Sequence, residues 1–264
     1  MVSSLILSTL LLAVPSKLNH PHQISAQGAE SPGSESQVTG ETPKHLAVAR
    51  DLVQKLKGSG LNVYGGGKRE IAWEASPATA RTVCSSFETL LLQHTYHLSD
   101  QAITNWFGLV NPKASDYHDE IVNGNRFRRI LRVEDLRPGD YLAIRFYDGH
   151  ENKKGAEDTG HVMLVDEAPH PMEAVDPIVS GTTQFSIRVV DSSASGHGKE
   201  DTRHLPSGGY SGGIGIGNFR IYANSSGEIA GCAWSTSPKS EFFHAPDRNL
   251  VAGRLKLSQN RPGR

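Results

Sequence analysis

Hydrophobic residues follow two different periods along this chain, one helical before Gly139 and one strand-like after it. In the first half, Leu46, Ala49, Val53 and Leu56 recur at steps of three and four residues, which is the spacing of one face of an α-helix. After Gly139, short apolar segments rich in β-branched and aromatic residues are separated by turn residues. Helices followed by an antiparallel meander predict an α+β fold, with the helices packed on one side of the sheet.

The same periodicity predicts three more helices and five strands. A helix begins at Cys84, because Leu91 lies on the same face two turns later. Ser99 is placed to cap a third helix over residues 100–107, and a fourth runs through residues 117–122. The predicted strands cover residues 141–147, 161–167, 185–191, 219–222 and 228–234.

The two ends of the chain differ from its centre. Residues 5–14 form an apolar run that is too short to span a bilayer, which takes about 20 residues, and that is typical of a secretory signal peptide. We therefore expect a signal peptide over residues 1–26 and a secreted or periplasmic protein. Polar composition predicts a flexible linker over 27–43. A single domain is expected over 44–258, followed by a disordered tail over 259–264.

Charge and cysteine content exclude several classes of protein. The chain has 264 residues with 27 Lys and Arg against 28 Asp and Glu, and no polybasic segment, so nucleic acid and anionic membranes are not expected partners. After the N-terminal run, no stretch is long enough to span a membrane. Two cysteines do not make a disulfide framework in a chain of this length. We expect a monomer without a membrane span.

Three residues stand where a cysteine hydrolase needs them. Cys84 opens a predicted helix, where the helix dipole and unpaired N–H groups favour a thiolate and can hold an oxyanion. His161 opens one predicted strand, and Asp191 ends the next. In an antiparallel pair these strand ends lie side by side, so His161 is the expected general base and Asp191 the residue that orients its ring, if the register brings them together.

The segments around these residues resemble the NlpC/P60 group of papain-like cysteine peptidases. In that family a cysteine starts a helix, a Pro-Gly-Asp turn opens the sheet, and a following strand supplies the catalytic histidine. The resemblance covers about residues 61–192. It is carried by YGGG at 64–67, CSSF at 84–87, EDLRPGDYLAI at 134–144, GHVMLV at 160–165 and VVDSS at 189–193.

The resemblance implies a papain-like fold and hydrolysis of a peptide or amide bond through a thioacyl-enzyme on Cys84. Members of the family commonly cut cell-wall peptides, so a peptide or peptidoglycan fragment is the implied substrate. Neither a metal nor another cofactor is implied. The chain departs from the family pattern at Val83, where Asp is usual, at Ser86, where Gly is usual, and in additional helical residues over 99–125.

Three further residues are expected to contact the substrate. Tyr64 matches by position a tyrosine that the family carries near a glycine-rich turn. Ser85 follows the nucleophile directly. His197 belongs to the polar loop 191–204, which we expect to line the substrate groove beside Asp191.

Two alternatives remain open at this point. The protein is a secreted binding module without catalysis if Cys84 and Cys232 form a disulfide, although Cys232 by itself is read as a core residue of a strand. It is a metal-dependent hydrolase if His197, Asp201 and His204 converge on an ion, although their spacing matches no zinc signature.

The glycine-rich segment at residues 208–217 is not a phosphate-binding loop. A phosphate loop leads directly into a helix, whereas a strand is predicted here. We expect a flexible lead-in or a β-bulge.

Overall fold

The computed structural model describes residues 41–65, 67–147 and 159–257. The predicted signal peptide, the linker up to residue 40 and the tail over 259–264 lie outside the described residues. None of the helices in the described part of the chain is long and apolar enough to cross a lipid bilayer.

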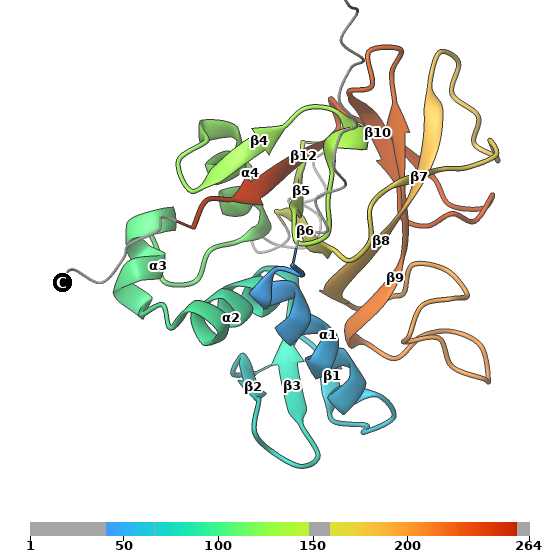
Figure 1. Cartoon of the computed structure of the whole chain (residues 1–264). Helices are drawn as coiled ribbons and strands as arrows, with labels where there is room; N and C mark the ends of the chain where they lie inside the picture. The colour runs from blue at the N-terminus through green and yellow to red at the C-terminus, as the bar shows by residue number, and fades with distance from the viewer. Residues whose placement is uncertain (1–40, 66, 148–158, 258–264) are drawn as a thin grey trace, which may run out of the picture. The chain divides into compact units, whose positions relative to one another are not determined.

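The described residues form a mixed α+β structure, as the sequence predicted (Figure 1). The helices are α1 (Lys44–Leu56), α2 (Cys84–Tyr96), α3 (Asp100–Phe107) and α4 (Ala114–Asn123), with a short 3-10 turn η1 (Val133–Asp135). The strands are β1 (Asn62–Tyr64), β2 (Glu70–Ala72), β3 (Thr79–Thr82), β4 (Phe127–Ile130), β5 (Tyr141–Phe146), β6 (Gly160–Val165), β7 (His170–Pro171), β8 (Thr183–Ser193), β9 (Gly213–Ala223), β10 (Ile229–Ala233), β11 (Phe242–His244) and β12 (Arg248–Leu255).

The helix predictions are confirmed where the apolar spacing was regular. The four apolar residues that define the predicted face of α1 are all buried. Helix α2 begins at Cys84, as predicted. The Ser99 hydroxyl accepts a hydrogen bond from the Ala102 N–H and so caps α3. Local signals were sufficient here, because a helix start depends on neighbouring residues.

The main sheet has the strand order β11-β10-β9-β8-β6-β5-β12-β4, with β7 paired to β8. From β5 to β11 the order follows the chain as an antiparallel meander, and the five predicted strands are confirmed within it. The last strand, β12, returns to lie between β5 and β4. A smaller sheet, with β3 between β1 and β2, leads directly into α2.

The glycine-rich lead-in predicted before residue 219 is instead a regular part of β9, and that expectation was wrong. Strand β9 begins at Gly213 and pairs with β8 along its whole length. A Cβ on Gly215 would lie 2.5 Å from the Arg203 side chain, and one on Gly217 would lie 2.3 Å from the Asp201 carboxylate. These glycines are therefore needed because any larger residue on β9 would collide with the loop that follows β8.

Two strands that the sequence analysis did not predict, β4 and β12, complete the sheet. Strand β4 reads Phe-Arg-Arg-Ile, and β12 contains Gly253 and ends among charged residues, so neither shows a clear strand pattern. The middle of β12 is nevertheless buried, because it is paired on both sides. Its strand character comes from tertiary pairing and not from local propensity.

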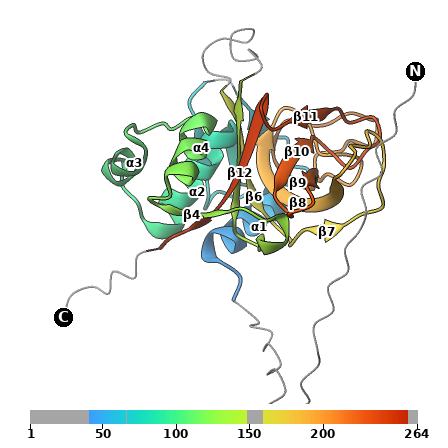
Figure 2. The same cartoon turned by 90° about the horizontal axis from the view of Figure 1, so that it is seen from above.

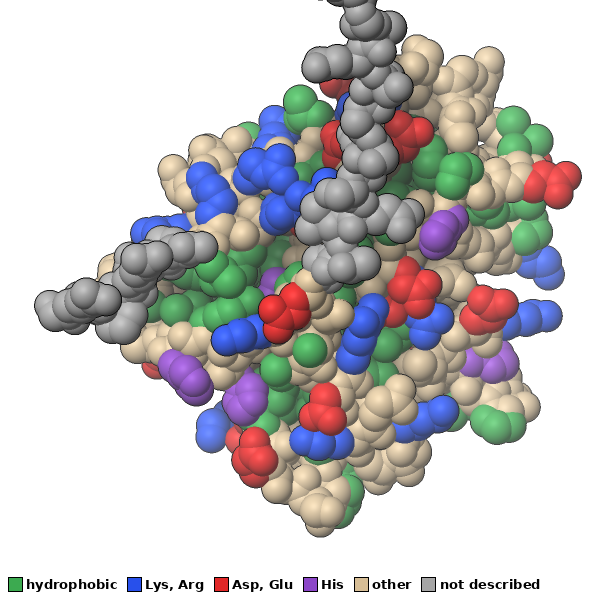
Figure 3. All heavy atoms as spheres, in the orientation of Figure 1, with side chains coloured by type: hydrophobic (Ala, Val, Ile, Leu, Met, Phe, Trp, Pro, Cys, Tyr) green, Lys and Arg blue, Asp and Glu red, His purple; other side chains and the backbone are tan. Residues whose placement is uncertain are grey.

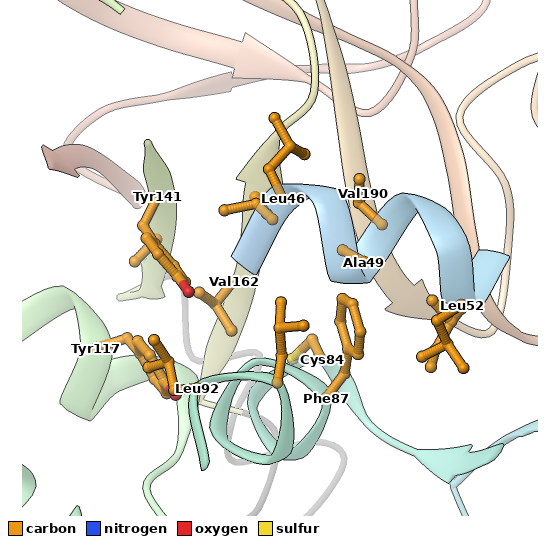
Figure 4. Close-up of a cluster of buried hydrophobic side chains, with 14 of the residues drawn as sticks. Leu46, Ala49, Leu52, Cys84, Phe87, Leu92, Tyr117, Tyr141, Val162 and Val190 are labelled. Carbon is orange, nitrogen blue, oxygen red and sulfur yellow. The ribbon is translucent and has the colours of Figure 1, made fainter. Parts of the chain in front are cut away.

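The sheet separates two hydrophobic cores. The first lies between the sheet and helices α1, α2 and α4, and Figure 4 shows how α1 and α2 face each other across it. It includes Leu46, Ala49, Leu52, Phe87, Leu92, Tyr117, Tyr141, Val162 and Val190.

The second core lies on the opposite face, where strands β8–β10 fold back over β5, β6 and β12. Figure 2 shows α2, α3 and α4 on one side of the central strands and β8–β11 on the other. Its residues include Leu142, Met163, Ile187, Val189, Phe219, Ile221, Leu250 and Cys232. The predicted packing of helices on one side of the sheet is thus confirmed, and the other side is covered by the sheet itself.

Gly160 is predicted to be essential for the pairing of β5 with β6. It has a φ of +151°, and a Cβ there would lie 1.8 Å from the Ile144 carbonyl oxygen. We expect Gly160→Ala to lower the free energy of unfolding by about 3 kcal/mol or more, from backbone strain and overpacking together. Urea denaturation followed by circular dichroism measures this.

The matched control is Gly181→Ala. Gly181 has a φ of +75° but nothing within 4 Å of an added Cβ, so only the backbone cost of about 1 kcal/mol is expected. Equal losses in the two variants would contradict the steric explanation.

Candidate active site

The helix start places Cys84 at the end of a strand and at the mouth of α2. Val83 has extended backbone, its N–H donates to the Ser86 hydroxyl at 2.9 Å, and its carbonyl accepts the first helical hydrogen bond from Phe87. The N–H groups of the first helical turn have no acceptor within the helix. Those of Cys84 and Ser85 are therefore available to a negatively charged oxygen beside the sulfur. The Cys84 side chain lies at the border of the first core, 7% exposed (Figure 4).

His161 and Asp191 meet across β6 and β8. The His161 Nε2 and the Asp191 Oδ2 are 2.6 Å apart, and both side chains are buried. The sequence left the register of these strands open. In the structure the paired stretch is short, with Leu164 opposite Val190 and Val165 opposite Val189. Cys84 also lies near enough to His161 to interact with it electrostatically. Because Nε2 is engaged by Asp191, Nδ1 is the ring nitrogen left for the sulfur, and the three predicted residues lie together.

The electrostatic surroundings keep a proton on His161. Burial lowers the pKa of His161, but the neighbouring Cys84 and the hydrogen bond to Asp191 outweigh it and raise the pKa from 6.5 to about 10. The ring is therefore an imidazolium at neutral pH, the form that stabilises a thiolate. Its contribution to stability is complete below pH 6.5 and is lost as the pH rises through about 10.

Asp191 stays ionised although it is fully buried. Burial raises the pKa of Asp191, but the charges of Arg203 and His197 and the hydrogen bonds from His161 and His197 bring it well below its usual value of 3.8. The Arg203 Nη2 donates to Oδ1 at 2.8 Å, while both histidines reach Oδ2. Three cationic or polar donors thus fix the carboxylate that orients the His161 ring.

His197 occupies a different position from the one expected. It does not line an open groove, because it is only 1% exposed. Its Nδ1 donates to the Trp234 carbonyl at 2.7 Å, and its Nε2 lies 3.1 Å from the Asp191 Oδ2. Both ring nitrogens thus face hydrogen-bond acceptors. His197 is therefore a positioning residue for Asp191, and the expected substrate contact is corrected.

Arg203 is a site residue that the sequence analysis missed. Its guanidinium is buried and donates to Asp201, to Asp191 and, at 3.1 Å, to the Gly213 carbonyl. Asp201 in turn accepts from the N–H of His197 at 2.8 Å. The polar loop 191–204 thus folds into a buried ion network. No local pattern reveals this, because the partners lie on β8 and β9.

Trp234 covers the two histidines and was also missed. Its ring centroid lies 4.8 Å from that of His161 and 4.5 Å from that of His197. The indole shields the hydrogen bond between His161 and Asp191 from water, which strengthens it. The predicted strand 228–234 contained this tryptophan, but only the folded sheet brings it over the site.

Tyr64 and Ser85 lie close to the nucleophile along the chain fold. Tyr64 ends β1 and pairs with Thr82, two residues before Cys84. It is 36% exposed, and its Cβ lies 3.0 Å from where a Cβ on Gly212 would be. Ser85 follows Cys84 in the first turn of α2 and is buried.

Glu88 is a buried carboxyl one helical turn after Cys84. Neither carboxylate oxygen has a hydrogen-bond partner among the described residues. Burial, together with the nearby Asp191 and Cys84, raises the pKa of Glu88 well above 4.5. The fold therefore favours the neutral form of this side chain. A signal did exist in the sequence, since a glutamate four residues after Cys84 falls on the buried face of the helix.

The metal alternative is not supported by the arrangement of its residues. Asp201 is occupied by Arg203, and His204 is exposed and packs against the Tyr210 ring. In the described part of the chain, the side chains whose ligand atoms converge within 4.8 Å are instead His161, Asp191 and His197. These atoms are already hydrogen-bonded to one another, and Arg203 on the same carboxylate opposes a further cation.

The two cysteines are both free thiols. Cys84 belongs to the first core, and Cys232 lies on β10 in the second. Burial raises the pKa of Cys232 from 9.0 to about 12. The disulfide required by the binding-module alternative is not formed in this structure, and Cys232 is suited only to packing.

Comparison with known proteins finds one informative relative. The chain is 32% identical over 227 residues to the uncharacterized protein R653 of Acanthamoeba polyphaga mimivirus, and the match covers 81% of this chain and 97% of the viral protein. No protein-family model matches the chain, and no solved structure matches it.

Replacing Glu88 with glutamine is expected to stabilise the protein at neutral pH. Above pH 4.5 the unfolded chain ionises Glu88 while the folded chain keeps its proton, so the carboxyl lowers the free energy of unfolding increasingly as the pH rises. Glu88→Gln removes this effect. We expect a gain of about 1 kcal/mol or more at pH 7 and a smaller one at pH 4, measured by urea denaturation.

The matched control is Glu173→Gln, which changes an exposed carboxyl and should alter stability by less than about 0.5 kcal/mol. A gain for Glu88→Gln that is the same at both pH values would show that the buried side chain is not kept neutral.

Proposed function

The chain belongs to the family of the mimivirus protein R653, and we propose that it is an exported cysteine hydrolase that cleaves a peptide or amide bond. The observation that carries the proposal is the meeting of Cys84 with His161, whose ring is hydrogen-bonded to the buried Asp191. A sulfur at a helix start beside an imidazolium held by a buried carboxylate is the arrangement that nucleophilic cysteine catalysis needs.

The proposed reaction uses each group once in acylation and once in deacylation. The Cys84 thiolate attacks the carbonyl carbon, and the N–H groups at the start of α2 hold the oxyanion. The His161 Nδ1 then donates its proton to the leaving amine, and a thioacyl-enzyme remains. Neutral His161 next takes a proton from water, whose oxygen attacks the thioester and releases the acid. Asp191 holds the ring in place throughout.

The order of elements supports a papain-like domain of the NlpC/P60 type. The nucleophile starts a helix that packs on an antiparallel meander, the second meander strand carries His161, and the third carries Asp191. The Pro-Gly-Asp turn before β5 has Gly139 at a φ of +89°, and the Asp140 carboxylate accepts from the Arg137 N–H at 2.7 Å. This turn fixes the entry into the strand that lies beside His161.

The proposed substrate is a peptide of the peptidoglycan type. The resemblance to cell-wall peptidases and the predicted signal peptide point to the same compartment. Tyr64 and the first turn of α2 are the described parts that a bound peptide would meet first.

Replacing Cys84 with alanine is expected to abolish hydrolysis while leaving the fold intact. Purified peptidoglycan and synthetic stem peptides are incubated with the protein, and the products are identified by mass spectrometry. We expect turnover to fall by at least about 1000-fold, because no other group can form the acyl-enzyme. Cys232→Ala, which removes the other thiol, should retain activity.

The same proposal is tested without a known substrate by alkylation. Iodoacetamide at pH 7 should label Cys84 and not Cys232, and His161→Ala should slow labelling of Cys84 by about tenfold or more, because the imidazolium no longer stabilises the thiolate. Peptide mapping by mass spectrometry gives both rates. Labelling of Cys84 no faster than in the urea-unfolded protein would contradict the mechanism.

The pH dependence of the reaction is expected to report on His161. Activity should fall as the pH rises through about 10, because the imidazolium then loses the proton that the leaving amine requires. Asp191→Asn removes the negative charge beside His161. This change lowers the pKa of the ring, so the loss of activity should move to lower pH and turnover should drop by about 100-fold or more.

Asp166→Asn is the matched control, since Asp166 is also buried and ion-paired, with Arg50 and Arg188, but follows the far end of β6. It should leave the pH profile unchanged. An equal shift of the activity–pH profile in Asp191→Asn and Asp166→Asn would show that Asp191 does not set the pKa of His161.

A further inference from the structure

A pocket of about 550 Å³ lies at the edge of the main sheet formed by β4 and β12. Figure 3 shows Lys and Arg side chains gathered over this part of the molecule. The pocket is lined by residues of β4, of the segment around η1, of the turn before β10, and of β12, among them Arg128, Arg129, Arg132, Arg137 and Arg254.

Arginines are concentrated in this pocket although the chain as a whole is balanced in charge, and two of them are paired with neighbouring carboxylates. Five of the lining residues are arginines, and two are carboxylates, Asp135 and Glu228. The whole chain has 27 basic and 28 acidic residues. Four of the five arginines lie within residues 128–137, and the pairing of β12 with β4 brings Arg254 beside them.

Arg254 is fixed at one side of the pocket. Its Nε and Nη2 donate to the two Asp140 carboxylate oxygens at 2.7 and 2.8 Å, and its Nη2 also donates to the Asp135 carbonyl at 3.0 Å. Arg128 stands directly opposite Arg254 in the antiparallel pairing of β4 with β12. Like charges in directly opposed positions destabilise a sheet unless a counter-charge lies between or beside them.

Of the other arginines, Arg132 is paired with a carboxylate, whereas Arg128 and Arg137 are not paired with one among the described residues. Arg132 donates to the exposed Glu134 at 3.1 Å, and its guanidinium packs against Gly227, where a Cβ would lie 3.1 Å away. Among the described residues, neither Arg128 nor Arg137 has a carboxylate within 4.0 Å, and both are exposed. Their planar donor forks are thus available to a ligand.

We propose that this pocket binds a small ligand that carries phosphate groups. A guanidinium fork pairs two donors with two oxygens of one phosphate, and Arg128 and Arg137 each offer such a fork at this pocket. The volume is within the range of small-molecule pockets and exceeds the needs of one free ion. Extended nucleic acid or a membrane surface would require a basic stripe or a broad basic face, whereas these arginines line one concave site.

The pocket is independent of the proposed hydrolase chemistry. It lies at the β4 edge of the main sheet, whereas His161 and Asp191 belong to β6 and β8, two or more strands away in the sheet order. Binding is therefore tested on the inactive Cys84→Ala protein, so that failure of the catalytic proposal has no effect on this measurement.

Inorganic pyrophosphate is the probe, and its binding is measured by isothermal titration calorimetry at constant ionic strength. We expect binding to the Cys84→Ala protein, and about tenfold weaker binding when Arg128→Gln or Arg137→Gln is added, since each change removes a charge-assisted contact. Lys239→Gln, which removes one positive charge from an exposed position outside the pocket, should leave the affinity within about twofold.

Two further titrations identify the source of the phosphate. An inositol phosphate represents a lipid headgroup, and a nucleoside diphosphate represents a soluble metabolite. The tighter ligand indicates the natural class, and either result supports a phosphate pocket. Absence of pyrophosphate binding, or equal weakening by all three charge-removing variants, would overturn the proposal.

Discussion

The buried carboxylate of Asp191 is the charge on which the candidate site depends. It has no exposure to solvent, and a buried ion is tolerated only when its partners replace water. His161, His197 and Arg203 supply the donors. The need for a partner extends to Arg203, whose buried guanidinium donates to Asp201. The loop that carries Arg203 and Asp201 packs on β9, where Gly215 and Gly217 leave space for these two side chains. The geometry of the candidate site and the composition of β9 are thus parts of one constraint.

The folding of the sheet over itself explains how a site at the start of α2 becomes enclosed. The helices cover one face of the central strands, and β8–β10 return over the other. His161 stands at the start of β6, where the fully buried part of that strand meets Trp234 from the returning half. The triad therefore lies where the two cores meet, with the sulfur on the helical side and the carboxylate on the side of the sheet.

Apolar spacing and turn residues were enough to predict the start of α2, the cap of α3 and the five meander strands, because these depend on neighbours in sequence. The meeting of Cys84, His161 and Asp191 was predicted from the ends of elements, although the sequence left the register open. The roles of His197 and Arg203 depend on pairing between strands far apart in the chain, which no local pattern records. Strand β12 was missed for the same reason, since its burial comes from its neighbours.

The separation of the two cysteines has a consequence for oxidative damage. If Cys84 acts as the proposed nucleophile, its sulfur is the one that peroxide attacks, and a sulfenic acid is normally rescued by a second thiol that forms a disulfide with it. Cys232 belongs to the other core, so it is not placed to serve as that resolving thiol. Protection of Cys84 against irreversible sulfinic acid formation must therefore come from outside the molecule, through small thiols or reductases of its surroundings.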